Sequence, residues 1–319
     1  MGGLALACSP GWPFPRGMHT SMQPAGASRR AFLQGTALGL LAAGAAASPV
    51  RAAVPAAATG GAGDGMHLGM VTYNLGKDWD VPAIIQRCSE ARFEGVELRT
   101  THAHKVEVAL TKTERAEVKR RFDDSPVKLF GLGSAFDYHT PDPARLRRDI
   151  EATREYIVLA HDVGATGVKV RPNALPKEVP VEKTLEQIGR SLRELGGFAA
   201  DHGQQIRLEV HGSGTSSLPR IKTIMDVAQH PQVGVCWNSN QTDLDGAGLE
   251  ANFDLVKDRI VAVHMRDLFL EEYPWRRLLA RLNQSGFRGF CLAEIPESAD
   301  PVRVMRYYRG LWLAHQQRL

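Results

Sequence analysis

The stretch Arg207-Leu208-Glu209-Val210-His211-Gly212 alternates apolar and charged residues and then stops at a glycine. An alternation with a period of two is typical of a β-strand, so we expect a buried strand that ends in charge. Glu209 and His211 fall on the same face of that strand, and both are costly to bury without a partner. The pattern therefore predicts a strand that brings an acid and an imidazole to a functional surface.

Three later apolar runs end in a similar way. They are Val233–Trp237 followed by Asn238, residues 260–263 followed by His264, and residues 290–293 followed by Glu294. The four runs lie roughly thirty residues apart, and in a barrel of parallel strands such ends converge on one mouth. Because each run stops at a residue that can bind a cation, we expect the mouth to be the functional site.

From His67 onward the chain alternates strand-like and helix-like segments. We expect strands at residues 68–73, 95–99, 127–132, 167–171, 206–211, 233–237, 260–263 and 289–293. Helices between them are indicated by the N-cap residue Asp80, by a capping box from Thr111 to Glu114, and by an apolar stripe in residues 185–199. Strands joined by helices are parallel, which makes the chain an α/β protein.

Eight such units in about 250 residues predict a single closed (β/α)8 TIM barrel. The alternative is an open doubly wound sheet, which usually carries a glycine-rich phosphate turn after its first strand. Here that position reads Tyr73-Asn74-Leu75-Gly76, with one glycine, so the barrel is favoured.

The N-terminal region has the features of an export signal. Ser28-Arg29-Arg30-Ala31-Phe32-Leu33 is a twin-arginine motif, and an uncharged run at 35–47 and small residues up to Ala53 follow it. The run is shorter than the ~20 residues that cross a bilayer as a helix. We therefore expect a signal region at 1–53, which is recognised by the twin-arginine export machinery, a linker at 54–66 and the barrel at 67–319. The alternative is an Ala-rich tail with a chance arginine pair, and translation could start at Met18 or Met22.

The charge of the chain is concentrated in that signal region. Four of the 39 basic residues and none of the 35 acidic ones precede residue 64, so the remainder is formally neutral. A neutral barrel carries no electrostatic footprint for nucleic acid, and we expect none as a partner. The expected location is periplasmic or secreted. Cys88, Cys236 and Cys291 are widely spaced and are expected to be small buried residues rather than a disulfide framework.

Glu209, His264 and Glu294 are the strongest candidates for function at the mouth. Two carboxylates a few ångström apart repel each other, and unless one stays protonated a cation is the simplest way to neutralise them. Oxygen and imidazole ligands suit a divalent metal ion such as Mn, Mg, Zn or Co. The alternatives are that each Glu is a solvated or arginine-paired charge and that the His is a hydrogen-bonded structural residue.

Several short motifs occur in a characteristic order. They are Tyr73 after the first strand, Gly95-Val96-Glu97-Leu98, Leu208-Glu209-Val210-His211, Val263-His264-Met265-Arg266-Asp267-Leu268 and Ala293-Glu294. In these motifs the chain from His67 to its end resembles the sugar phosphate isomerase/epimerase, or xylose-isomerase-like, barrel superfamily. Ketose 3-epimerases of this superfamily hold a divalent metal on Glu, Asp, His and Glu. The resemblance implies Glu209, Asn238, His264 and Glu294 as the corresponding ligands.

The sixth-strand position departs from that pattern, because Asn238 stands where the epimerases have Asp and Gln241 stands where they have a further His. An amide oxygen can bind a metal but brings no charge, so we expect a weaker site. His211, Asn240 or Asp243 are alternative ligands. Endonuclease IV shares the barrel, but its richer set of histidines is not found in this sequence.

The resemblance implies proton transfer beside a carbonyl, assisted by the metal, with Glu209 and Glu294 as the acid/base pair. The substrate is expected to be a sugar or keto-sugar, which is either isomerised or epimerised. The alternatives are β-elimination from a 3-keto-glycoside, catalysed by a lyase, and a non-catalytic sugar-binding barrel. A homo-oligomer is compatible with the sequence. The residues expected to hold the substrate are Tyr73, Arg99, Lys169, His211, Asn240 and Arg266.

Lys169 has an alternative role in an ion pair inside the barrel with Glu97 or Glu209. His102 and His104 are either further contacts to sugar hydroxyls or exposed histidines of a loop.

Overall fold

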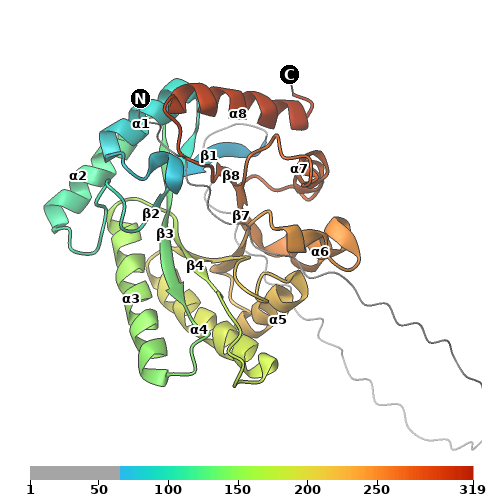
Figure 1. Cartoon of the computed structure of the whole chain (residues 1–319). Helices are drawn as coiled ribbons and strands as arrows, with labels where there is room; N and C mark the ends of the chain where they lie inside the picture. The colour runs from blue at the N-terminus through green and yellow to red at the C-terminus, as the bar shows by residue number, and fades with distance from the viewer. Residues whose placement is uncertain (1–64, 319) are drawn as a thin grey trace, which may run out of the picture. The chain divides into compact units, whose positions relative to one another are not determined.

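The computed structural model describes residues 65–318. The predicted signal region and the predicted linker up to residue 64 lie outside the described residues. Eight parallel strands form one closed barrel, in which each strand pairs with the next and the eighth pairs with the first (Figure 1). The strands are β1 (His67–Val71), β2 (Gly95–Arg99), β3 (Lys128–Asp137), β4 (Gly167–Arg171), β5 (Gln205–Glu209), β6 (Val233–Trp237), β7 (Ile260–Met265) and β8 (Phe290–Ala293).

Helices follow the strands and cover the outside of the barrel (Figure 1). They are α1 (Val81–Ala91), α2 (Lys112–Asp123), α3 (Pro143–Asp162), α4 (Val181–Asp201), α5 (Leu218–Ala228), α6 (Gly248–Val256), α7 (Trp275–Gln284) and α8 (Pro301–His315), with short 3-10 turns η1 (Asn74–Gly76), η2 (Gln241–Leu244) and η3 (Lys257–Arg259). In the described part of the chain, no helix combines the length and the apolar character needed to span a bilayer. The predicted TIM barrel is confirmed, and the open doubly wound sheet is excluded.

The local signals in the sequence act as expected. Asp80 caps α1 by accepting the backbone N–H of Ala83, and the capping box at Thr111 and Glu114 begins α2. The apolar stripe of α4 is buried against the barrel. Cys88, Cys236 and Cys291 are buried free thiols, as predicted.

The predicted end of β3 was wrong by five residues. The sequence predicts an end at residue 132, where Gly133 and Ser134 interrupt the apolar run, but β3 continues to Asp137. Pairing with its neighbours carries the strand on, because Gly133 pairs with Arg99 of β2 and Asp137 pairs with Arg171 of β4. The interstrand ladder thus overrides the weak strand preference of glycine and serine.

The inside of the barrel contains both apolar and charged residues. A small apolar cluster includes Phe130 and Phe290. The guanidinium of Arg207 lies fully buried 3.7 Å from the centre of the Phe130 ring and donates to the Phe130 carbonyl at 2.9 Å. Gly131 and Gly167 leave room for it, since a Cβ on Gly131 would lie 2.6 Å from Nη1 of Arg207. A charged side chain, Arg207, is therefore buried inside the barrel together with the apolar residues.

Candidate metal centre

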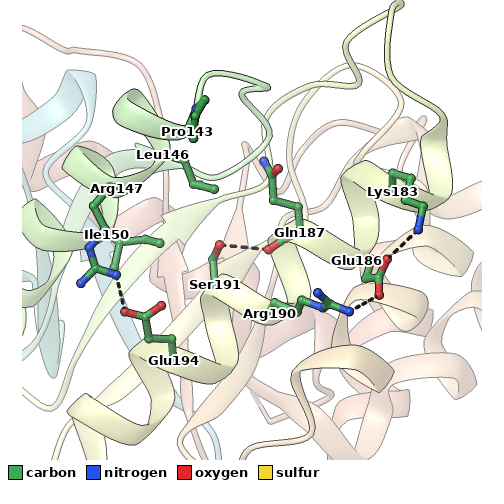
Figure 2. A pocket seen from close by; sticks show the side chains of 10 residues that line it. All are labelled: Pro143, Leu146, Arg147, Ile150, Lys183, Glu186, Gln187, Arg190, Ser191 and Glu194. Carbon is green, nitrogen blue, oxygen red and sulfur yellow. Dashed lines mark hydrogen bonds and ion pairs between the residues drawn. The ribbon is translucent and has the colours of Figure 1, made fainter.

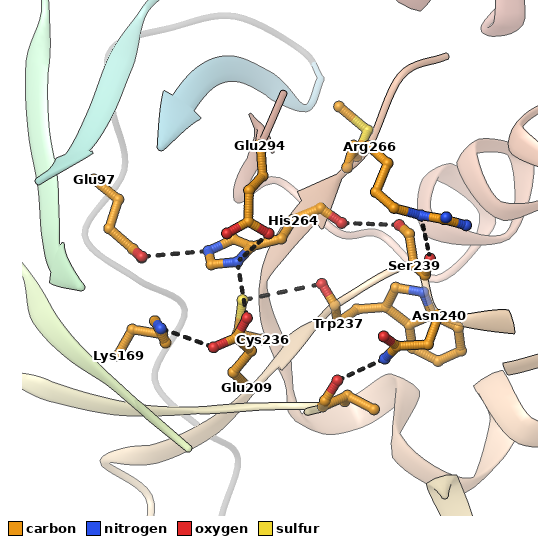
Figure 3. Close-up of polar contacts among 12 residues, drawn as sticks. Glu97, Lys169, Glu209, Cys236, Trp237, Ser239, Asn240, His264, Arg266 and Glu294 are labelled. Carbon is orange, nitrogen blue, oxygen red and sulfur yellow. Dashed lines mark hydrogen bonds and ion pairs between the residues drawn. The ribbon is translucent and has the colours of Figure 1, made fainter. Parts of the chain in front are cut away.

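Glu209, His264 and Glu294 meet at one end of the barrel. Glu209 is the last residue of β5, His264 lies near the end of β7, and Glu294 directly follows β8. One ligand atom of each lies within 4.8 Å of the others. Nδ1 of His264 is 3.5 Å from Oε1 of Glu209 and 3.7 Å from Oε2 of Glu294 (Figure 3). Three positions far apart in the sequence thus converge, because the carboxyl ends of parallel strands share one mouth.

The donor set fits a divalent cation. Both ring nitrogens of His264 are buried, and neither has a hydrogen-bond partner among the described residues. Nδ1 faces two carboxylate oxygens at separations of 3.5 and 3.7 Å. Ligands placed about 2.1 Å from a tetrahedral zinc ion lie about 3.4 Å from one another, which is close to these spacings. One imidazole nitrogen and two carboxylate oxygens also match the ligand preferences of Zn and Mn.

Asn238, the fourth expected ligand, follows β6 and is half-buried. It has the same inward parity as Cys236, which belongs to the apolar cluster inside the barrel. That Asn238 binds a metal ion stays a prediction.

Asn240 and Asp243, which were considered as alternative ligands, are held by other groups. The Asn240 amide donates to the Val210 carbonyl at 2.6 Å, and its side-chain oxygen caps η2. One oxygen of Asp243 accepts from the Tyr273 hydroxyl at 2.7 Å and from the Asn240 backbone N–H at 2.9 Å. Neither Asp243 nor His211 joins the group of convergent ligand atoms.

Lys169 forms the ion pair that was considered as its alternative role. Its ammonium donates to Oε2 of Glu209 at 2.7 Å and to the Ser134 carbonyl at 3.2 Å, and both charged side chains are buried. The contact occupies one oxygen of Glu209 and leaves Oε1 turned toward His264.

The two carboxylates of the centre have opposite electrostatic environments. Burial favours the neutral form of Glu209, but the charges of Lys169 and His264 outweigh it and hold the pKa of Glu209 well below its usual value. Burial raises the pKa of Glu294, and the neighbouring Glu209 adds to this effect, whereas His264 opposes it. The surroundings therefore push the pKa values of Glu209 and Glu294 in opposite directions. Carboxylates whose pKa values are pushed apart in this way are suited to acid and base roles.

Glu97 is the residue of the centre to which the sequence assigned no role in the chemistry. It lies in β2, is fully buried, and places Oε1 at 3.3 Å from Nε2 of His264. Burial opposes a charge on the His264 ring, but the surrounding acidic groups Cys236, Glu97 and Glu209 raise its pKa well above the usual value. The available signal was a glutamate that alternates with the apolar residues Val96 and Leu98 and shares the parity of Arg99 at the end of the strand.

The residues expected to hold a substrate are spread around the mouth. The Arg99 guanidinium lies 5.2 Å from the centre of the Tyr73 ring. Nε of Arg266 donates to the Ser239 carbonyl at 3.1 Å, and its Nη2 is buried without a hydrogen-bond partner among the described residues. His211 is half-buried, and burial lowers its pKa. Their contacts with a substrate stay predictions.

His102 and His104 differ from the expectation for loop histidines. Nδ1 of His102 lies 3.0 Å from the Thr72 hydroxyl, and burial lowers its pKa to about 4. His104 is buried, with Nε2 at 2.8 Å from the Arg99 carbonyl and Nδ1 accepting the Val106 N–H. The interpretation of His104 as exposed is wrong, because both ring nitrogens hold the loop backbone.

A cavity of about 580 Å³ lies between α3 and α4 on the outside of the barrel (Figure 2). Apolar side chains such as Leu146 and Ile150 share its lining with charged pairs, including Arg147 with Glu194 at 2.7 Å. None of the residues of the metal centre lines it. This cavity is therefore separate from the candidate metal centre.

Comparison with solved structures places this architecture among known barrels. The chain is similar to 3-keto-D-glucoside 4-epimerase, YcjR, from E. coli, with 15% identity, a TM-score of 0.65, and coverage of 78% of this chain and 99% of that chain. It is similar to D-psicose 3-epimerase from Clostridium cellulolyticum H10, with 12% identity, a TM-score of 0.65, and coverage of 77% and 99%. A third similar structure is the IolI protein with a bound zinc atom, with 15% identity, a TM-score of 0.63, and coverage of 78% and 96%.

At such low identity these structures establish a shared fold. No curated protein matches the sequence. A family model described as xylose isomerase-like TIM barrel matches residues 85–310, which is most of the chain. The chain therefore belongs to the xylose isomerase-like TIM barrel family.

Proposed function

We propose that the protein is a metal-dependent sugar isomerase or epimerase that transfers a proton next to a carbonyl. The observation that carries the proposal is the convergence of Glu209 and Glu294 on Nδ1 of His264, at 3.5 and 3.7 Å. A divalent ion bound by these residues would polarise a substrate carbonyl and acidify the neighbouring C–H bond. Asn238 is proposed as a fourth ligand.

The two carboxylates supply the proton transfer. The Lys169 ammonium holds Glu209 in place and lowers its pKa, so Glu209 is proposed as the base that removes the proton. Burial raises the pKa of Glu294 relative to that of Glu209, so Glu294 is proposed as the group that returns a proton to the other side of the carbon. Removal and return on opposite faces invert the stereocentre, which is epimerisation.

The names of similar structures support the substrate class. Two of them are epimerases of a 3-keto-glucoside and of a ketose, and a third holds zinc. We propose a sugar or keto-sugar as the substrate on this basis, with Tyr73, Arg99 and Arg266 as contacts at the rim. We further propose export through the twin-arginine pathway, on the motif at Arg29 and Arg30.

The proposal is tested by hydrogen exchange at carbon. The exported protein is loaded with Mn²⁺ or Zn²⁺ and incubated in D2O with a panel of ketoses and 3-keto-glycosides, and deuterium at carbon is measured by NMR. We expect incorporation in the wild type and its loss in Glu294→Gln, because the amide cannot carry the proton. Glu297→Gln is the matched control, since Glu297 is exposed and pairs with Lys77.

Two outcomes would contradict the proposal. Exchange in Glu294→Gln at the wild-type rate would remove the acid/base role of Glu294. Full activity of a protein that elemental analysis finds free of metal would exclude a metal requirement for the reaction.

A lyase is the second candidate. A general acid at Glu294 would protonate a departing alkoxide as well as a carbon, so the same residues would support β-elimination from a 3-keto-glycoside. Release of the aglycone distinguishes this reaction from epimerisation. Binding of the sugar without any turnover would favour a non-catalytic barrel instead.

A further inference from the structure

We propose that Glu97 is a positioning residue of the metal centre. It takes the Nε2–H of His264 and thereby fixes the tautomer whose Nδ1 lone pair faces Glu209 and Glu294. The inference rests on the proposed function, since it concerns how this chain prepares one of its metal ligands.

The contact between Glu97 and His264 crosses the inside of the barrel. Glu97 lies in β2, whose neighbours are β1 and β3, whereas His264 lies in β7, whose neighbours are β6 and β8. Pairing between strands therefore does not impose the approach of Oε1 to Nε2 at 3.3 Å. The two side chains point toward each other across the inside of the barrel (Figure 3).

Glu97 has an uncommon environment for a carboxylate. It is fully buried, and neither of its oxygens has a fully formed hydrogen bond among the described residues. Burying an ion costs several kcal/mol unless partners compensate it. The loose 3.3 Å approach to His264 is the one ion-pair contact of Glu97 in residues 65–318. Gly133 admits the group, since a Cβ there would lie 2.8 Å from Oε1 of Glu97.

The ring of His264 is divided between two kinds of neighbour. Nε2 faces Glu97, and Nδ1 faces Glu209 and Glu294. A histidine binds a metal in its neutral form, which has one N–H and one lone pair, and an ionised carboxylate only accepts. With the N–H on Nε2, Glu97 receives a donor and Nδ1 keeps the lone pair that a metal requires. A carboxylate behind a metal-binding histidine also orients the ring and increases its basicity.

The competing explanation is that Glu97 only offsets nearby cations. Arg207 and Lys169, however, have direct partners elsewhere. Arg207 donates to the Phe130 carbonyl and to the Thr166 hydroxyl, and Lys169 donates to Glu209. Neither cation comes within 4.0 Å of Glu97. A purely compensating charge would strengthen metal binding by electrostatic attraction alone, and Glu97→Gln and Glu97→Ala would lose that attraction equally. A positioning residue keeps part of its effect in Glu97→Gln, whose amide oxygen still accepts the Nε2–H.

Metal affinity therefore tests the assignment. Dissociation constants for Zn²⁺ and Mn²⁺ are measured by chelator competition for the wild type, Glu97→Gln and Glu97→Ala, together with the absorption spectrum of each Co²⁺ form. We expect about a 10- to 100-fold weaker affinity in Glu97→Ala, the range typical of lost outer partners of metal ligands. Glu97→Gln should fall between this value and the wild type, because its amide oxygen still accepts Nε2–H but carries no charge.

Asp137→Asn is the matched control. Asp137 is also a buried carboxylate beside a histidine, with Oδ1 at 3.0 Å from Nδ1 of His139, but it has no contact with His264. Its metal affinity and Co²⁺ spectrum should match those of the wild type. Glu97→Gln is nearly isosteric and decides the question even where Glu97→Ala fails to fold.

The outcomes separate this assignment from the proposed function. Wild-type affinity in a folded Glu97→Gln and in Glu97→Ala would overturn the role of Glu97 alone. A wild-type protein that binds no divalent ion would overturn the metal-dependent function and this assignment with it.

Discussion

For single residues, the pKa of each charged side chain at the barrel mouth depends on the groups that it contacts. Lys169 holds one oxygen of Glu209, Glu97 faces one nitrogen of His264, and Glu294 is left with the raised pKa. Chemically similar carboxylates thus acquire different properties from their neighbours alone. The same reasoning applies to Asp243, which lies outside the convergent ligand group and can be tested by its effect on stability.

Asp243 makes the stability of the fold depend on pH. Burial raises its pKa to about 7, against the hydrogen bonds from Tyr273 and Asn240 that lower it. In the unfolded chain the group titrates near its ordinary value of about 4. Its protonated form is favoured by folding, so its contribution to stability is complete below about pH 4 and is lost as the pH rises to about 7.

We therefore expect the wild type to lose free energy of unfolding, relative to Asp243→Asn, as the pH rises from about 4 to about 7. Urea denaturation across this range measures the difference. Asp201→Asn, which changes an exposed carboxyl at the end of α4, should follow the wild type. Parallel curves for the wild type and Asp243→Asn would contradict the raised pKa.

At the scale of elements, the ends of the strands determine where the functional side chains lie. β5 stops at Glu209, and the chain turns at Gly212, where φ is +96°. A Cβ on Gly212 would lie 1.9 Å from the Asn173 carbonyl oxygen, which belongs to the loop after β4. Two neighbouring loops thus touch through a glycine, and that contact fixes the direction of the chain just beyond Glu209 and His211.

Gly212→Ala should therefore destabilise the protein by more than the roughly 1–2 kcal/mol that a left-handed conformation costs a residue with a Cβ. Gly203→Ala is the matched control, because its φ is +64° and a Cβ there meets nothing within 4 Å. Thermal unfolding of both variants measures the difference. Equal shifts in Tm would show that the close contact with Asn173 adds nothing.

At the scale of the whole molecule, the barrel separates stability from chemistry. The large apolar core lies between the strands and the surrounding helices, whereas the inside carries buried ionic side chains. The charged side chains inside the barrel contact one another or the backbone, as Arg207, Lys169 and Glu97 show. The candidate metal site at the mouth is thus separate from the apolar core that stabilises the fold.

The proposed export through the twin-arginine pathway concerns the whole protein and is tested on the full-length chain. Replacing Arg29 and Arg30 together by Lys should leave the protein unprocessed in the cytoplasm, because the twin-arginine pair is the recognition signal. Cell fractionation and mass spectrometry of the N-terminus measure the result, with cleavage expected near Ala53. Arg87→Lys, which lies in α1 and far from the motif, should be exported normally. Equal export of the double variant would exclude the twin-arginine route.

The architecture and the three convergent residues could be predicted from the amino-acid sequence. The alternation of apolar strands with helices required parallel pairing, and parallel pairing brings the strand ends that carry Glu209, His264 and Glu294 to one mouth. These signals are local and periodic, so they can be recognised in the amino-acid sequence.

The contacts between side chains inside the barrel could be identified only from the folded structure. Glu97 and His264 lie in strands that are not neighbours, and Lys169 could have paired with either Glu97 or Glu209. No local pattern encodes contacts across the lumen, because they depend on the radius of the barrel, on the register of its strands and on glycines such as Gly133 that leave space for a carboxylate.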